Sequence, residues 1–63
     1  MDEEGYVSAP LITIGEAADY LGVDRKTIYR LIEWGEIIAV KVGRGIRIEK
    51  KSLERVRNAG RLF

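Results

Sequence analysis

The chain has 63 residues, contains no Cys and no His, and carries a formal net charge of +1. A domain of this size buries only about 60% of the surface that its unfolded chain exposes, which leaves little volume for an internal pocket. Without Cys and His there is no disulfide, no thiolate or imidazole metal site and no histidine general base. These counts favour a single binding domain over an enzyme and predict neither a cofactor nor a bound metal.

The composition is typical of a soluble globular domain, with 46% hydrophobic and 33% charged residues. No apolar run approaches the ~20 residues that a transmembrane helix needs, and the acidic N-terminus lacks the apolar region of a secretory signal. We therefore expect a cytoplasmic protein with no membrane partner.

The charges are segregated along the chain. The first 24 residues contain six acidic residues and no Lys or Arg, whereas residues 25–63 contain all 11 Lys and Arg and only four acidic residues. A basic segment of this kind favours a negatively charged partner, nucleic acid first. A solvated surface carries the same residue types, so charge alone does not separate the two interpretations.

Residues 1–10 are predicted to form an acidic flexible tail, because they show no hydrophobic periodicity. Thr13 and Glu16 have the spacing of a capping box, which predicts a helix from about residue 14 to residue 21. Gly22 is expected to end this helix as a left-handed C-cap. The predicted buried stripe of the helix consists of Ile14, Ala17, Ala18 and Leu21.

Asp24 is a candidate N-cap for a second helix from about residue 25 to residue 34, which Gly35 ends. The outward face of this helix is mostly basic, because Lys26, Arg30 and Glu33 lie opposite its apolar stripe. Two short helices joined by a turn that contains Gly form a helix-turn-helix, whose second helix enters the DNA major groove. An ordinary αα-hairpin obeys the same packing rules but does not explain the basic face. The predicted apolar stripe consists of Ile28, Leu31 and Ile32.

Beyond residue 37 the pattern alternates with a period of two residues on both sides of Gly43-Arg44-Gly45, which predicts a β-hairpin. The glycines are expected to supply the positive φ angles of a tight turn, with Arg44 at its tip. Lys41 and Arg47 flank the tip, so the hairpin suits a basic wing on a phosphate backbone or in a minor groove. A merely solubilising hairpin is the alternative. The glycines do not make a nucleotide fingerprint, because the third glycine of that motif is missing. One strand face is expected to carry Ile38, Val40 and Val42, and the other Ala39 and Lys41.

A short third helix is predicted from about residue 52 to residue 58, with Ser52 or Lys51 in its cap region. Leu53 and Val56 are expected to pack beneath the hairpin. The basic residues of this segment either extend a DNA footprint or are simply solvated. They are Lys50, Lys51, Arg55 and Arg57.

Together these elements predict an α+β fold, a winged helix-turn-helix domain over residues 11–58 that is followed by a C-terminal tail over residues 59–63. The Trp34 ring is expected to cover the core, while Ile46 is assigned either to the core or to a partner surface. Leu62-Phe63 is expected either to fray or to dock on this domain or on another copy.

Several segments match one family pattern: residues 12–23, 27–32, 35–37, 40–44 and 47–48, and Leu53. In these segments the chain closely resembles the excisionase-family DNA-binding domains, over about residues 11–56. The resemblance implies a small winged helix related to the MerR-type fold, with its second helix in a major groove and its wing on the adjacent backbone or minor groove. Three departures are Asp24 in place of a common Ser, Lys51-Ser52 in place of Ser-Asp, and the more apolar Gly45-Ile46 in the wing.

The resemblance and the charges together give a set of candidate DNA contacts. Arg30 and Lys26 carry donors for guanine O6 and N7, Thr27 offers its methyl group to thymine, and Tyr29 suits a sugar or phosphate. The cations are expected to displace counterions from phosphates. The candidates are Arg25, Lys26, Thr27, Tyr29 and Arg30 on the helix, and Lys41, Arg44 and Arg47 in or beside the wing.

The resemblance further implies an excisionase role, in which double-stranded DNA near an attachment site is bound and bent to assist an integrase in excision. Because one domain of this size offers only a small contact area with DNA, several copies are expected to bind side by side. The expected location is the nucleoid of a bacterium or its phage. A small transcriptional regulator would use the same contacts and is the alternative. The chain is not expected to be an enzyme, because the acidic residues Glu16, Asp19 and Glu33 are interpreted as solvated helix charges and not as a catalytic acid and base. A protein-interaction adapter would instead use Tyr29, Trp34, Ile46 and Leu62-Phe63.

Overall fold

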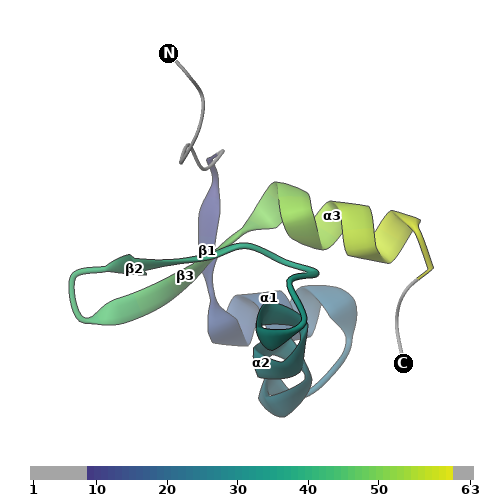
Figure 1. The fold of residues 1–63 in the computed structure, drawn as a ribbon, viewed down its shortest axis with the longest axis horizontal. Coiled ribbons are helices and arrows are strands. Elements are labelled where there is room, and N and C mark those ends of the chain that lie inside the picture. Colours follow the sequence, from purple (N-terminus) through teal and green to yellow (C-terminus); the bar gives the residue numbers. More distant parts are fainter. Residues whose placement is uncertain (1–8, 61–63) are drawn as a thin grey trace.

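The computed structural model describes residues 9–60, so the expectations for residues 1–8 and for Leu62-Phe63 lie outside the described residues. The elements are β1 (Leu11–Thr13), α1 (Ile14–Leu21), α2 (Arg25–Glu33), β2 (Ala39–Val42), β3 (Gly45–Glu49) and α3 (Lys50–Asn58). In Figure 1, α3 lies on one side of the domain, α1 and α2 lie on the other, and the β2–β3 hairpin projects beyond the helices. This is the predicted α+β layout of a winged helix-turn-helix.

Both helices of the helix-turn-helix begin at the predicted caps. Thr13 Oγ1 accepts a hydrogen bond from the Glu16 N–H at 3.0 Å, and Glu16 Oε1 accepts one from the Thr13 N–H at 2.9 Å. At the start of α2, Asp24 Oδ1 accepts a hydrogen bond from the Thr27 N–H at 2.9 Å. Gly22 ends α1 in the left-handed region with a φ of 72°. The capping box, the second N-cap and the turn glycine are therefore confirmed.

The hydrophobic core forms where α1 meets α2 and where α3 closes over them. Ala17 and Ala18 are both buried on α1, and such small side chains let two helices approach closely. Leu53 and Val56 of α3 are buried as predicted. The buried hydrophobic residues are Ala17, Ala18, Leu21, Ile28, Leu31, Ile37, Ile48, Leu53 and Val56. Ile14 and Ile32, also expected in the buried stripes, pack half-buried against this cluster.

The strand β1 was not predicted. It pairs antiparallel with β3, with Ile12 opposite Ile48, so that β3 lies between β1 and β2 in the sheet. A strand of three residues is too short to show a period of two, and its partner is far away in the sequence. The Pro10 carbonyl extends the pairing by accepting a hydrogen bond from the Lys50 N–H at 3.1 Å. The segment that leads into α1 is thereby tied to the base of the wing.

The hairpin strands alternate as expected, but the core face is the one that carries Ala39. Ala39 pairs with the fully buried Ile48 and packs against the core. Residues directly opposite each other on antiparallel strands share a face, so Ile48 fixes this choice. On the other face, Ile38 and Val42 are 39% and 46% exposed.

The turn of the hairpin consists of Gly43 and Arg44, and the pairing of Val42 with Gly45 closes it. Gly43 has a φ of 60°, and Arg44 is exposed at the tip. A glycine with positive φ in the first position of a two-residue turn matches the twist of hairpin strands. The expectation that Gly45 also has a positive φ is wrong, because Gly45 is already part of extended strand β3.

Two large apolar side chains are exposed and do not belong to the core. Trp34 was expected to extend α2 and cover the core, but α2 ends at Glu33 and Trp34 is its C-cap residue, 57% exposed. Ile46, which the sequence left open, is 39% exposed. Ile46 shares a strand face with Ile48 but lies nearer the tip, where the hairpin extends past the helices (Figure 1).

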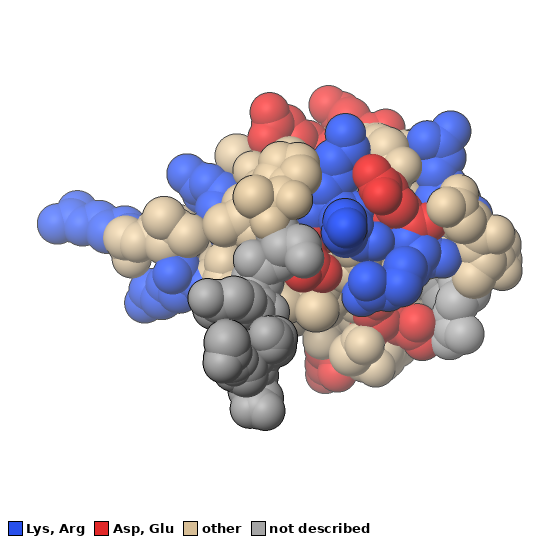
Figure 2. Space-filling view, turned by 90° about the horizontal axis from the view of Figure 1, so that it is seen from above, with Lys and Arg blue, Asp and Glu red and all other residues tan. Residues whose placement is uncertain are grey.

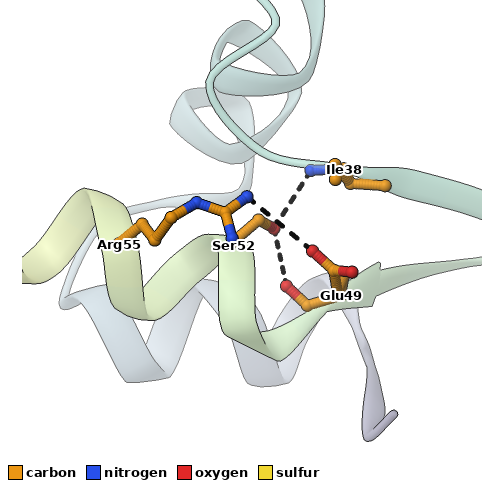
Figure 3. Close-up of polar contacts among 4 residues, drawn as sticks. All are labelled: Ile38, Glu49, Ser52 and Arg55. Carbon is orange, nitrogen blue, oxygen red and sulfur yellow. Dashed lines mark hydrogen bonds and ion pairs between the residues drawn. The ribbon is translucent and has the colours of Figure 1, made fainter. Parts of the chain in front are cut away.

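The start of α3 also differs from the prediction. The helix begins at Lys50, with Glu49 as its N-cap and no side-chain cap bond, and Ser52 is fully buried. The Ser52 hydroxyl donates to the Glu49 carbonyl at 2.7 Å and accepts from the Ile38 N–H at 3.0 Å (Figure 3). The Glu49 N–H in turn donates to the Ile38 carbonyl at 2.9 Å. These three hydrogen bonds lock the base of the wing to the first turn of α3.

Basic side chains of α3 contact the domain itself. Arg55 Nη2 lies 3.9 Å from Oε1 of the buried Glu49 (Figure 3). Lys50 Nζ and Arg57 Cζ lie 5.5 Å and 5.0 Å from the ring centroid of Tyr20 on α1, which is within the range of cation–π attraction. The two contacts with Tyr20 attach α3 to α1 in addition to the apolar core, and the Arg55–Glu49 pair attaches α3 to the end of β3.

The capping hydrogen bonds hold two carboxyl groups in their charged form. The Thr27 hydroxyl, followed by the Thr27 N–H, lowers the pKa of Asp24 below its ordinary value. The Thr13 N–H, followed by the Thr13 hydroxyl, lowers the pKa of Glu16 in the same way. A carboxyl group with a lowered folded-state pKa adds stability above its unfolded-state pKa, and that stability is lost as the pH falls through the folded-state pKa.

Replacement of Ser52 by Ala should destabilise the domain by about 1–3 kcal/mol, because the Ile38 N–H and the Glu49 carbonyl each lose a partner in the interior. Urea unfolding followed by circular dichroism measures the change. Lys51→Ala, at the exposed neighbouring position, should stay within about 0.5 kcal/mol of the original chain. Equal stability of the two variants would contradict the role of Ser52.

Replacement of Asp24 by Asn should leave the melting temperature at pH 7 nearly unchanged, because Asn caps helices as well as Asp. Below about pH 4, the original chain loses the contribution of the charged cap and the Asn variant does not, so the variant should lose less stability between pH 5 and pH 2. Thermal melts across this pH range test the expectation. Asp19→Asn, on the exposed face of α1, is the control and should keep the original acid sensitivity.

Candidate nucleic-acid interface

Helix α2 buries one face and presents the opposite face to solvent. Ile28 and Leu31 are fully buried, whereas Lys26 and Arg30 are exposed and Tyr29 is 51% exposed. The apolar inner face fixes the rotation of α2 about its own axis, because turning the helix would bring charged groups into the core. The basic face predicted for this helix is therefore accessible to a partner.

Thr27 has a structural task within the same helix. It is half-buried, and its hydroxyl donates to Asp24 Oδ1 at 2.7 Å in addition to the backbone cap bond. The hydroxyl proton is thus committed to the N-cap of α2. The apolar contact predicted for the Thr27 methyl group does not require this proton.

Arg25, the first residue of α2, extends to the neighbouring helix. A Cβ atom placed on Gly15 would lie 2.9 Å from Arg25 Nη2 and 3.6 Å from Arg25 Cζ and Nε. The guanidinium group therefore lies directly against the first turn of α1. Arg25 is classed as exposed, so this position keeps the cation at the surface.

Arg47 approaches the same turn of α1 from the sheet. It is half-buried on β3 and pairs with Thr13 of β1. Arg47 Nη1 donates to the Ile46 carbonyl at 3.1 Å. After the hydrogen bonds from Thr13, the positive charge of Arg47 is a further cause that lowers the pKa of Glu16. The Arg47 cation is therefore close enough to the capping box of α1 to act on it electrostatically.

The first turn of α1 consequently lies between two arginines that are far apart in the sequence. Arg25 reaches it from α2, and Arg47 reaches it from β3, because β1 both pairs with β3 and continues into α1. This arrangement connects the helix-turn-helix to the wing through one surface. We call the surface formed by Arg25, Lys26, Arg30 and Arg47 the basic surface.

The remaining two predicted wing contacts lie apart from this surface. Lys41 is exposed on β2 opposite Ile46, and Arg44 is exposed in the turn. Figure 1 shows the turn projecting away from the helices. Figure 2 shows Lys and Arg side chains at the projecting end of the wing, whereas acidic and basic side chains are mixed over the helices. Arg25 and Arg47 thus lie around the start of α1, Lys26 and Arg30 lie exposed on α2, and Arg44 lies at the wing tip.

Sequence reasoning did not single out Gly15, against which Arg25 lies, and assigned Gly45 to the turn without the approach of Arg47. A weak signal existed for Gly15, since a glycine inside a predicted helix is unfavourable and indicates a close approach by another group. For Gly45 the turn explanation was sufficient and concealed the contact with Arg47.

Within residues 9–60 no pocket is found, and no group of three or more acidic residues is arranged to hold a metal ion. None of the helices in this part of the chain is both long and apolar enough to span a bilayer.

Comparison with known proteins agrees with this geometry. The family described as Helix-turn-helix domain matches residues 11–61. An excisionase of Mycobacterium phage D29 is 46% identical over 43 residues, which are 67% of this chain and 77% of the phage protein. Two proteins of Mycobacterium tuberculosis, from strains H37Rv and CDC 1551, carry the name of a candidate DNA-binding protein and are each 42% identical over 43 residues.

The match to the two M. tuberculosis proteins covers 68% of this chain and 55% of each of them, so the chain spans about half the length of these relatives. The family match includes both helices of the helix-turn-helix, the wing and α3. The similarity to the phage excisionase confirms the resemblance seen in the motifs. The chain therefore belongs to the helix-turn-helix domain family and is an excisionase-like DNA-binding domain.

Proposed function

We propose that the chain binds double-stranded DNA with α2 in the major groove and the wing on the adjacent backbone or minor groove. The observation that carries this proposal is the basic surface, in which Arg25 of α2 and Arg47 of β3 approach the first turn of α1 while Lys26 and Arg30 lie exposed on α2. A helix-turn-helix places its second helix in the groove while the preceding helix crosses the backbone. Cations on both sides of α1 suit that arrangement, because phosphates flank the groove that α2 would enter.

The affinity is expected to come mostly from phosphate contacts. Each phosphate neutralised by Lys or Arg steepens the dependence of log K on log salt by about 0.9. If all six candidate cations contact phosphates, the slope reaches about −5. These cations are Arg25, Lys26, Arg30, Lys41, Arg44 and Arg47.

Sequence preference is assigned to α2 and not to the wing tip. Arg30 and Lys26 lie on the exposed face of α2 and carry donors for guanine O6 and N7. Arg44 lies at the end of a thin hairpin, which suits a contact with the backbone or minor groove. Contacts of the first kind specify a sequence, whereas contacts of the second kind mainly position the protein.

The biological role that best fits these features is that of an excisionase, which binds and bends DNA near an attachment site and assists an integrase without bond chemistry of its own. The similarity to a phage protein named excisionase, of which this chain covers 77%, supports the assignment. Because one domain of this size offers a small DNA contact area, several copies bound side by side are part of the proposal. So is a location on the nucleoid of a bacterium or its phage.

Arg30→Ala and Arg44→Ala should separate specific from general binding. A preferred site is first selected from a random-sequence duplex pool, and affinities are then measured by fluorescence anisotropy on that site and on a scrambled duplex. Arg30→Ala should lose about 1–3 kcal/mol more on the selected site than on the scrambled one. Arg44→Ala should weaken both about equally. Equal losses on both duplexes for both variants would contradict the assignment, and absence of salt-dependent binding by the original chain would contradict DNA binding itself.

The excisionase role predicts a deformation of the bound DNA. On a duplex that carries two adjacent selected sites, with dyes at its two ends, binding should shorten the end-to-end distance measured by energy transfer. Binding to the second site should be tighter than to the first if copies contact each other. A straight duplex with independent sites would favour the transcriptional regulator instead.

A further inference from the structure

Two glycines of this chain have a role that their backbone angles do not explain. We propose that Gly15 and Gly45 are positioning residues, which leave open the space in which the guanidinium groups of Arg25 and Arg47 lie on the basic surface. The inference rests on the proposed DNA binding, since it concerns how two of the proposed contact residues are held for that task.

The described glycines fall into two classes. Gly22, Gly35, Gly43 and Gly60 have φ angles between 60° and 76°, and a Cβ on any of them would meet nothing within 4 Å. At those four positions the backbone conformation favours glycine. Gly15 and Gly45 lack a positive φ, and a Cβ on either would meet an arginine at less than 3.0 Å. For these two, space and not backbone conformation accounts for the missing side chain.

Gly15 lies inside α1, where glycine is a poor helix former and alanine would be better. The space that its side chain would occupy is taken by the head group of Arg25, whose Nη2 is 2.9 Å from the Cβ position. None of the three nearest atoms belongs to the backbone or the core, since all three are at the end of the Arg25 side chain. A methyl group on residue 15 would therefore displace the guanidinium group and leave the packing of the helices intact.

Gly45 repeats the arrangement on the sheet. Arg47 Nη1 lies 2.7 Å from the Cβ position of Gly45, and the same nitrogen donates to the Ile46 carbonyl at 3.1 Å. Residues two apart on a strand share a face, so Gly45 is the neighbour of Arg47 toward the turn on that face of β3. A side chain at residue 45 would push the Arg47 head group off this hydrogen bond.

The position of these cations matters because phosphate recognition by arginine is directional. The guanidinium group donates through a rigid planar fork, and a displacement of the head group changes which phosphate oxygen it reaches. An arginine head group that already lies against a helix or strand loses less rotamer freedom on binding.

The test is Gly15→Ala, measured with a 20-base-pair mixed-sequence duplex by anisotropy over a salt series, together with a thermal melt. The affinity should fall by up to about eightfold at 0.1 M salt, because the loss of one phosphate contact lowers the salt slope by about 0.9. The melting temperature should stay equal or rise, because alanine replaces glycine within a helix. Opposite effects on stability and affinity distinguish a positioning role from a merely structural one.

Double variants supply the matched controls. In an Arg25→Ala background, Gly15→Ala should cause no further loss of affinity, because the displaced group is already absent. In a Lys26→Ala background, which removes a neighbouring cation of the same helix, Gly15→Ala should keep its full effect. Gly45→Ala should behave in the same way toward Arg47→Ala.

Each other result decides the matter. If Gly15→Ala binds DNA as tightly as the original chain while Arg25→Ala binds more weakly, the positioning role is overturned and DNA binding is not. The same conclusion follows if Arg25→Ala binds as tightly as the original chain. A full loss from Gly15→Ala in the Arg25→Ala background, or a lowered melting temperature, also overturns the role, because the methyl group then acts on something other than Arg25. If the original chain shows no salt-dependent binding to the duplex, the proposed function fails, and the inference fails with it.

Discussion

The pairing of β3 with strands on both of its sides is the constraint on which the rest of the structure depends. On one side β3 binds β2 and forms the wing, and on the other it binds β1, which continues without a break into α1. A small domain has few elements that can hold a wing against a helix-turn-helix. The central strand performs that task through backbone hydrogen bonds, and the fully buried Ile48 anchors it in the core of the helices.

The base of the wing is further fixed by a polar contact in an otherwise apolar interior. Ser52 brings together the start of β2, the end of β3 and the first turn of α3 with a single hydroxyl group that both donates and accepts. A buried polar group is acceptable only where its partners are all present, so the contact specifies one arrangement of the three elements. Because the wing projects beyond the helices, a small rotation at its base would move Arg44 over a much larger distance.

The electrostatics of the proposed interface follow from this framework. Strand pairing brings Arg47 to the capping box of α1, and the helix-turn-helix brings Arg25 to the same turn from the other side. Glu16 lies between hydrogen bonds from Thr13 and the field of Arg47, which keeps its carboxylate charged. The N-terminal end of a helix carries a partial positive charge, so the two cations, the helix end and one carboxylate form a surface whose net sign favours an anionic partner.

Local chemistry let the sequence determine α1 and α2, their N-caps and the turn glycines Gly22 and Gly43. These features depend only on residues within four positions along the chain, so they can be predicted without knowledge of any distant contact. They are the capping pairs Thr13–Glu16 and Asp24–Thr27 and the left-handed Gly22 and Gly43. Tertiary structure alone decided the existence of β1, the packing of Ala39 instead of Ile38 against the core, the exposure of Trp34 and the role of Ser52. It also decided which atoms Arg25 and Arg47 touch. Each of these features depends on a partner that is distant in the chain, or on which of two equally polar faces turns toward the core. The hydrophobic periods of a strand (two residues) and of a helix (3.6 residues) carry no information about distant partners or about this choice of face.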